Sequence, residues 1–183
     1  MSESTVVLAR DHRLTVVGVV GFAVALAAAS QVAIPIPGTS VPMTLQPLAV
    51  VLAGLWLGPV AGAASMVLYL AAGAAGLPVF APMGAPGMLR LLGPTGGYLW
   101  AYPVAAFVAG AIAQWRGSFA WRVLAAAAGI AALHLGGLAQ LTLLTGSVER
   151  AVVLGTLPFL AMDVVKSVLA GILSPARAGR ARG

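Results

Sequence analysis

The chain has 183 residues, of which 61% are hydrophobic and 8% are charged, and its mean hydropathy is +1.03. Soluble globular domains carry about 25% charged residues, so this composition excludes that class and indicates a membrane protein. The formal net charge of +6 gathers at the ends of apolar runs and forms no basic face interleaved with aromatic residues, which argues against nucleic-acid binding.

The first half of the chain predicts three spans, since a transmembrane helix needs about 20 apolar residues. The first is expected over 14–34 and is read as a retained helix, not a cleaved signal peptide. A proline-rich outer loop follows over 35–44, because proline blocks helix interiors. Two shorter spans, over 45–57 and 60–75, are separated by the tight turn Leu57-Gly58-Pro59.

The second half begins with a long outer loop over 76–94 that is rich in glycine and proline. Proline is favoured at the first helical position, so the last helix is expected to begin at Pro158. Asp163 then lies about 7–8 Å below the outer end of that helix, and Lys166 one turn deeper. The remaining spans are predicted over 95–113, 123–144 and 158–174, with an outer loop over 145–157.

The distribution of Lys and Arg residues predicts how the chain is oriented in the membrane. With the N-terminus inside, Arg90 and Arg150 fall outside, Lys166 lies in the membrane, and seven arginines fall in the cytoplasm. Six spans with both termini in the cytoplasm therefore satisfy the positive-inside rule. The predicted fold is an all-α membrane protein with six transmembrane helices, a single domain over 1–183. The seven cytoplasmic arginines are Arg10, Arg13, Arg116, Arg122, Arg177, Arg180 and Arg182.

Asp163 and Lys166 are the only charges in the apolar stretch from Ala151 to Ala176. A charge at the centre of a membrane helix costs roughly 2.5–3.5 kcal/mol by insertion scales, so such residues are functional candidates. Their i, i+3 spacing places both side chains on one helix face, where one small molecule can touch both. A purely structural salt bridge is the alternative.

Other polar residues are candidates for ligand binding, and each also has a purely structural interpretation. Arg90 is flanked by apolar residues, as though its loop folds down as a lid, and its guanidinium suits bidentate carboxylate recognition. Gln46 can donate to and accept from an amide-like ligand, or brace a loop. Tyr98 is an interfacial anchor or a pocket wall, and Thr95 is expected to cap its helix.

His134 is expected to form hydrogen bonds between helices, and with His12 as the only other histidine no metal site is expected. The chain has no cysteine, no H-E-x-x-H, no G-x-S-x-G and no second membrane aspartate, so an enzyme is not expected. It also has no G-x-x-x-x-G-K-[ST] phosphate loop, so any ATP-driven step requires another subunit.

Small residues recur four apart in the first span, where Ala23 pairs with Ala27 and Ala25 with Ala29. Small-xxx-small faces let another helix approach closely. From the residues alone, packing within the chain is favoured over a partner.

Several segments in order resemble the BioY family, the biotin-specific S components of energy-coupling-factor (ECF) vitamin transporters. The resemblance covers about residues 23 to 173. The segments that carry it are Ile34-Pro35-Ile36-Pro37, Val41-Pro42-Met43-Thr44-Leu45-Gln46, Leu52-Ala53-Gly54-Leu55-Trp56-Leu57-Gly58-Pro59, Leu68-Tyr69-Leu70, Gly76-Leu77-Pro78-Val79-Phe80-Ala81, Leu92-Gly93-Pro94-Thr95-Gly96-Gly97-Tyr98, and Leu157-Pro158-Phe159 leading to Asp163 and Lys166.

The resemblance implies a six-helix S-component fold in a prokaryotic cell membrane, with biotin in an outward-opening pocket and no cofactor. It also implies that the small-residue pairs of the first span dock a transmembrane coupling subunit powered by two cytoplasmic ATPases, which reverses the preference for internal packing. A homo-oligomer is left open. The substrate-binding residues expected on this basis are Asp163, Lys166, Arg90, Gln46, Tyr98 and Thr44.

In the favoured orientation, Asp163 accepts from the ureido N–H groups of biotin, Lys166 donates to the ureido oxygen and Arg90 pairs with the carboxylate. The reverse orientation, with Lys166 on the carboxylate, remains open. Two other functions also remain: an ion-coupled secondary transporter of a small carboxylate that uses Asp163 as a proton relay, and an S component for another vitamin.

Overall fold

The computed structural model describes residues 3–176, with side chains from Arg13 onward. The side chain of Arg10 and the predicted basic cluster at Arg177, Arg180 and Arg182 therefore lie outside the described residues. The elements in chain order are α1 (Glu3–Gln31), β1 (Ala33–Ile34), β2 (Met43–Thr44), α2 (Gln46–Leu57), α3 (Pro59–Ala74), α4 (Met88–Leu92), α5 (Gly96–Ala113), α6 (Phe119–Thr145), α7 (Val148–Gly155) and α8 (Leu160–Leu173).

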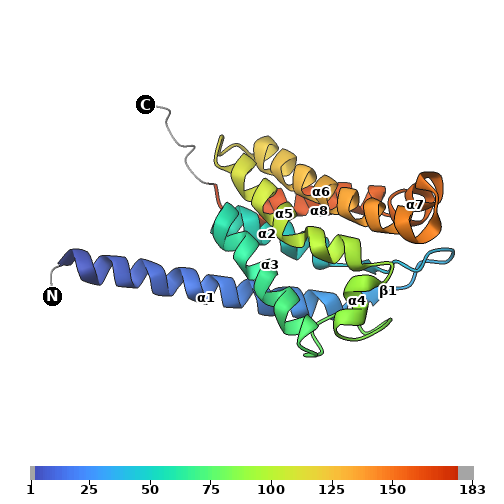
Figure 1. Ribbon diagram of the computed structural model, residues 1–183. Helices are drawn as coiled ribbons and strands as arrows, with labels where there is room; N and C mark the ends of the chain where they lie inside the picture. Colours follow the sequence, from blue (N-terminus) through green and yellow to red (C-terminus); the bar gives the residue numbers. More distant parts are fainter. Residues whose placement is uncertain (1–2, 177–183) are drawn as a thin grey trace.

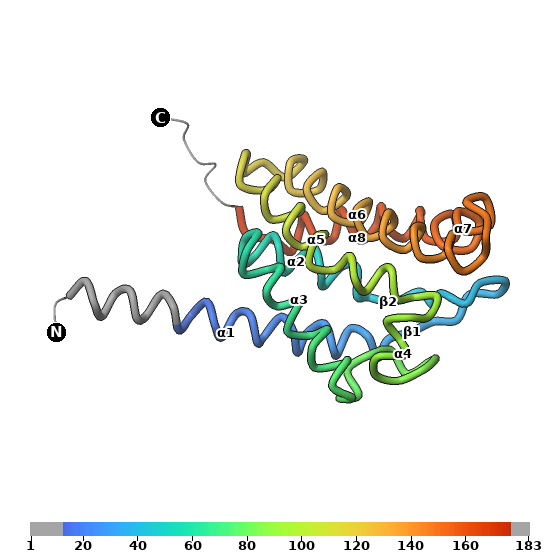
Figure 2. Tube along the Cα trace, in the orientation of Figure 1, coloured from blue at the N-terminus to red at the C-terminus, as the bar shows by residue number. Residues whose placement is uncertain are grey.

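The helices form one bundle with two distinct ends (Figure 1). The beginning of α1 and the end of α8 lie at one end, whereas the β1–β2 hairpin, α4 and α7 lie at the other, and the chain path can be followed in Figure 2. An even number of membrane crossings requires the first helix to begin and the last helix to end on the same side of the membrane, and here they do so at the same end of the bundle. Which end faces the cytoplasm stays a prediction.

Three helices in the described part of the chain are long and apolar enough to cross a membrane: α1 from Arg13, α5 and α6. The pair α7 and α8 also qualifies if it is taken as one span, although its two helices are bent by 56°. The helices α2 and α3 are apolar but shorter. The count of six spans therefore remains a prediction.

Helix α5 is the centre of the bundle and packs against α2, α3 and α6. Its small residues Ala105, Ala106 and Ala109 are fully buried, which lets the neighbouring helices approach closely. Helix α6 crosses α5 closely, because a Cβ added to Gly97 or Gly136 would collide with the backbone carbonyl of the other glycine. Small side chains along α5 therefore set the spacing of the whole bundle.

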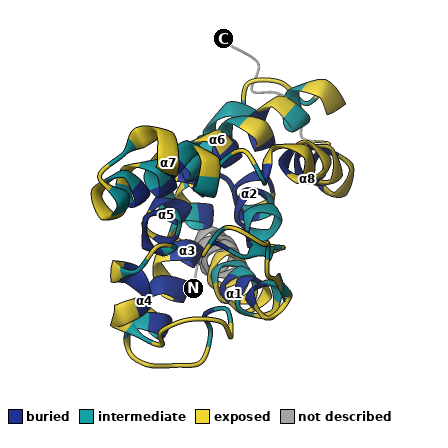
Figure 3. Ribbon diagram, turned by 90° about the vertical axis from the view of Figure 1, so that its right-hand side faces the viewer, coloured by how far each residue is buried: buried dark blue, intermediate teal, exposed yellow. Residues whose placement is uncertain are grey.

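Many large hydrophobic side chains are exposed on the outside of the bundle; Figure 3 shows the exposed positions in yellow. Leu143 is 85% exposed, Val60 73% and Val17 69%, on three different helices. Soluble monomers rarely expose contiguous apolar surface on this scale, whereas lipid chains solvate it without cost. This surface confirms the membrane class expected from composition.

Two predicted loops contain helices. The predicted outer loop over 145–157 contains α7, because Ser147 caps it by accepting a hydrogen bond from the Arg150 amide at 3.3 Å. The loop over 76–94 contains the short helix α4. Helix α6 begins at Phe119, four residues before its predicted start, because Ser118 caps it in the same way through the Trp121 amide.

The boundaries of two other spans differ from prediction, and one expected helix cap is not formed. The first helix ends at Gln31, because the chain turns into the antiparallel β1–β2 hairpin, in which Ala33 pairs with Thr44. Thr95 precedes α5 but makes no capping hydrogen bond through its side chain. Pro158 does not begin the last helix, since it lies in the break over 156–159 and α8 begins at Leu160. Asp163 therefore lies in the first turn of α8.

The turn between α2 and α3 is as predicted. Gly58 adopts φ +87°, a conformation that glycine reaches without strain, and its N–H donates to the Gly54 carbonyl at 2.9 Å. Pro59 then takes the first position of α3, where its missing N–H costs nothing.

The α5–α6 crossing predicts the effect of one methyl group. We expect Gly136→Ala to destabilise the protein by about 1–3 kcal/mol, because the new Cβ collides with the Gly97 carbonyl and the Ala101 side chain. Gly21→Ala is the matched control, since an added Cβ at that exposed position on α1 meets nothing within 4 Å. Thermal unfolding in detergent measures both, and an unchanged melting temperature for Gly136→Ala would contradict the close crossing.

Candidate functional site

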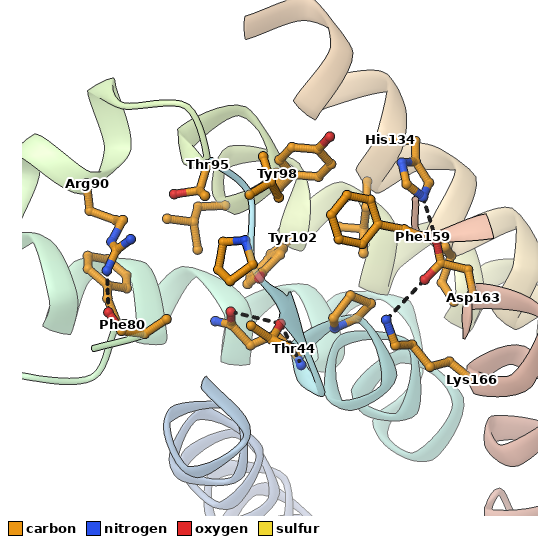
Figure 4. A pocket seen from close by; sticks show the side chains of 18 residues that line it. Thr44, Phe80, Arg90, Thr95, Tyr98, Tyr102, His134, Phe159, Asp163 and Lys166 are labelled. Atoms are coloured by element: carbon orange, nitrogen blue, oxygen red, sulfur yellow. Dashed lines mark hydrogen bonds and ion pairs between the residues drawn. The ribbon is translucent and has the colours of Figure 1, made fainter. Parts of the chain in front are cut away.

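A cavity lies among the hairpin, the start of α2, α4, α5, α6 and α8 (Figure 4). Its empty space is about 690 Å³, counting the part open to the outside. Its polar lining residues are Thr44, Gln46, Arg90, Thr95, Tyr98, Tyr102, His134, Asp163 and Lys166. Its apolar lining residues are Val41, Pro42, Pro47, Phe80, Ala81, Leu99, Ile130, Leu133 and Phe159.

One end of the cavity is formed by Asp163 and two cationic or donor groups. Lys166 Nζ donates to Asp163 Oδ1 at 3.1 Å, and His134 Nε2 lies 2.7 Å from Asp163 Oδ2. Asp163 is only 7% exposed and Lys166 only 3%. Because each carboxylate oxygen has two acceptor sites, Asp163 can still accept hydrogen bonds from a ligand while both contacts persist.

Arg90 lies at the opposite end of the cavity, as Figure 4 shows. This residue of α4 is 7% exposed, and its Nη2 donates to the Ala81 carbonyl. Its Nε is buried and has no hydrogen-bond partner among the described residues. Burial lowers the pKa of the Arg90 guanidinium, although the nearby hydroxyls of Tyr69 and Tyr102 act in the opposite direction. Arg90 therefore keeps donor capacity for an anionic group.

Gln46 and Thr44 lie side by side in the wall between the two ends. The Gln46 amide nitrogen donates to the Tyr69 hydroxyl at 2.8 Å, and the Thr44 hydroxyl lies 3.3 Å from Gln46 Oε1. Thr44 Oγ1 also accepts from the Gln46 backbone N–H at 3.3 Å. Gln46 thus braces the loop, as one sequence interpretation expected, and at the same time lines the cavity.

Tyr98 is a wall of the cavity and a link between helices. Its hydroxyl donates to the Gly155 carbonyl at the end of α7, and its ring meets the His134 ring edge to face at 6.0 Å between centroids. The polar tip of Tyr98 is therefore already used, which leaves its ring to contact a ligand.

The fold brings all six predicted substrate-binding residues to this single cavity, and their roles stay a prediction. Sequence reasoning missed His134 as a site residue, since it was assigned only to bonding between helices. That bond exists, but its partner is Asp163, 29 residues away on another helix. Phe159, Phe80 and Tyr102 were also missed, because nothing in an apolar sequence shows which aromatic rings face a cavity.

The two small-residue pairs of α1 face different directions. Ala23 is 8% exposed and belongs to the core of this chain, and Ala27 packs against that core. Ala23 and Ala27 thus contribute to packing within the chain, and their docking role stays a prediction. Ala25 is exposed, whereas Ala29 is half-buried like Ala27, so Ala25 is the most accessible of the four alanines.

Comparisons with known proteins agree with the sequence resemblance. A sequence model of the BioY family matches residues 3–182. A probable biotin transporter BioY of Pyrococcus horikoshii is 42% identical over 134 residues, which cover 73% of this chain and 78% of that protein. The biotin transporter BioY of Thermotoga maritima is 37% identical over 141 residues, which cover 77% of this chain and 83% of that protein.

The chain belongs to the BioY family. Its fold matches a solved structure described as the S-component for biotin from an ECF-type ABC transporter, with a TM-score of 0.81 over 94% of this chain and 92% of that chain. At 23% identity this likeness shows a shared fold. The all-α S-component fold expected from the sequence is therefore confirmed, and this BioY chain is a multi-pass membrane protein.

Proposed function

We propose that this BioY chain binds biotin in the cavity and takes it up across a prokaryotic cell membrane as the substrate-specific subunit of an ECF-type transporter. The relatives named above are described as biotin transporters, and the structural relative as an S-component for biotin. The proposal needs neither an enzyme activity nor a cofactor.

The observation that carries the proposal is the cavity with charged groups at two opposed ends and many apolar lining residues. Biotin has matching parts: a ureido ring with two N–H donors and one carbonyl acceptor, an apolar bicycle and chain, and a carboxylate. Asp163 supplies acceptors and Lys166 a donor at one end, while Arg90 supplies donors at the other. Phe80 beside Arg90, Phe159 beside Asp163 and the other apolar lining residues supply apolar surface for the bicycle and the chain.

The orientation follows from charge. The ureido group is neutral, and the joined Asp163–Lys166 pair offers one charge of each sign and no net charge. The biotin carboxylate is an anion, and Arg90 has no carboxylate partner among the ion pairs of the described residues. We therefore assign the ureido ring to Asp163 and Lys166 and the carboxylate to Arg90. Gln46 and Thr44 offer additional polar contacts, and Tyr98 a ring surface.

The partners in this proposal are a transmembrane coupling subunit and two cytoplasmic ATPases. The chain has no phosphate loop of its own, so ATP hydrolysis has to come from other subunits. We assign docking of the coupling subunit to the face of α1 that carries Ala25 and Ala29, since Ala23 and Ala27 are used inside the chain. Small side chains on that face permit close helix contact.

Titration of the purified protein with biotin, followed by calorimetry, tests the function directly. We expect saturable binding, and a Kd at least about 100-fold higher for Asp163→Asn, because the ureido N–H groups lose a charged acceptor and Lys166 loses its partner. Met162→Leu, an exposed neighbour on α8, is the control and should bind normally. Normal binding by Asp163→Asn would show that the site is assigned wrongly.

The orientation is tested with biotin methyl ester, in which the carboxylate is masked. Arg90→Met should weaken biotin binding by about 10- to 100-fold, because a charge-assisted hydrogen bond is lost, and should hardly change binding of the ester. The reverse orientation predicts the opposite result: ester binding insensitive to Lys166→Met and sensitive to Arg90→Met.

Docking is tested by uptake in cells that contain the coupling subunit and the ATPases. Ala25→Leu with Ala29→Leu should abolish ATP-dependent uptake and leave biotin binding by the isolated protein unchanged, because the bulk falls on an outer face. Val24→Phe, exposed about a third of a turn away on the same helix, should have little effect. Uptake that follows a pH gradient without ATPases would instead favour the ion-coupled alternative.

A further inference from the structure

His134 connects α6 to the charged end of the cavity and is mostly buried. Its Nε2 lies 2.7 Å from Asp163 Oδ2, while Lys166 Nζ occupies Asp163 Oδ1 at 3.1 Å. The two donors come from different helices and reach different oxygens of one carboxylate (Figure 4). Rotation of the carboxylate would break at least one of these contacts, so its orientation is fixed by both.

The protonation of the His134 ring follows from its surroundings. Asp163 is ionised beside Lys166, so the bond at Oδ2 needs a proton on His134 Nε2. Nδ1 is buried and has no partner among the described residues, so a second proton there would be an unsatisfied buried donor. The charged and titratable groups that face the ring are Asp163 and Lys166 from α8 and Tyr98 from α5. The contact with Asp163 therefore places a proton on Nε2.

The ring itself is held in place by packing. The Tyr98 ring meets it edge to face, with 84° between the planes, and the Tyr98 hydroxyl is anchored on the Gly155 carbonyl. A ring that is fixed before the ligand arrives loses little conformational entropy on binding. Nothing in this arrangement depends on contact between His134 and the ligand.

We propose that His134 is a positioning residue for the ligand: its Nε2–H holds Asp163 Oδ2 so that the remaining acceptor sites of the carboxylate point at the N–H groups of a cyclic urea. This inference rests on the proposed biotin function. It makes His134 a determinant of affinity for the ureido end, separate from Arg90 at the carboxylate end.

Three substitutions separate positioning from packing. His134→Leu fills the space without a donor and should raise the Kd for biotin by about 10- to 100-fold. Glutamine can place its amide nitrogen where histidine has Nε2, so His134→Gln should bind within about threefold of the unaltered protein. Asparagine places its nitrogen near the position of Nδ1, so His134→Asn should not restore binding. Melting temperatures show whether each variant is folded.

Biotin methyl ester serves as a control that shows which end of the ligand a substitution at His134 affects. His134→Leu should weaken biotin and biotin methyl ester by the same factor, because the effect passes through Asp163. The proposal is overturned if His134→Leu binds biotin normally, if the glutamine and asparagine variants are equally impaired, or if only the acid form is affected.

A spectroscopic test does not need biotin. The chain has two histidines, so ¹⁵N-histidine labelling of the His12→Gln variant gives signals from His134 alone. At neutral pH, we expect a protonated Nε2 in lipid nanodiscs. A ring protonated on Nδ1 alone would overturn the inference. If the unaltered chain fails to bind biotin while a protonated Nε2 is found, the proposed function is wrong and the positioning of Asp163 by His134 stands.

Discussion

A carboxylate and an ammonium group have to share a nearly dry site within an apolar bundle, and much of the structure meets that constraint. Removing one partner of a buried ion pair typically costs about 3–5 kcal/mol, because the other charge is left unpaired. Lys166 and His134 together satisfy both oxygens of Asp163. Loss of any member of this group therefore leaves a buried charged or polar atom without its partner, which destabilises the site. When all three are present, the group is paired and can bind a neutral polar ligand.

The sequence alone predicted much of the fold and the site. The turn at Gly58 was found because glycine reaches positive φ without strain and the following proline ends the preceding helix. Helices α2, α3 and α5 lie close to their predicted bounds. Asp163 and Lys166 were found because charges are rare in a membrane span. Polar residues in an apolar chain are conspicuous, so all six candidates were recognised before their positions in space were known.

What sequence reasoning missed depends on tertiary contacts. The partner of His134 lies on another helix, and no periodicity within α6 indicates it. The inward face of α1 could not be distinguished from its outward face, because alanines occupy both and Ala23 differs from Ala25 only in what packs against it. Helix α7 was missed for a different reason: the cap at Ser147 was present in the sequence, but the predicted span count left the segment as a loop.

The break between α7 and α8 decides more than where a helix ends. Each residue of an α-helix turns the chain by about 100°, so the position at which α8 begins sets the direction in which Asp163 and Lys166 point. Phe159 at the break is itself part of the cavity wall. The length of the segment over 156–159 thus sets the rotation of α8 about its own axis. That rotation determines whether the charged pair faces the cavity or the lipid.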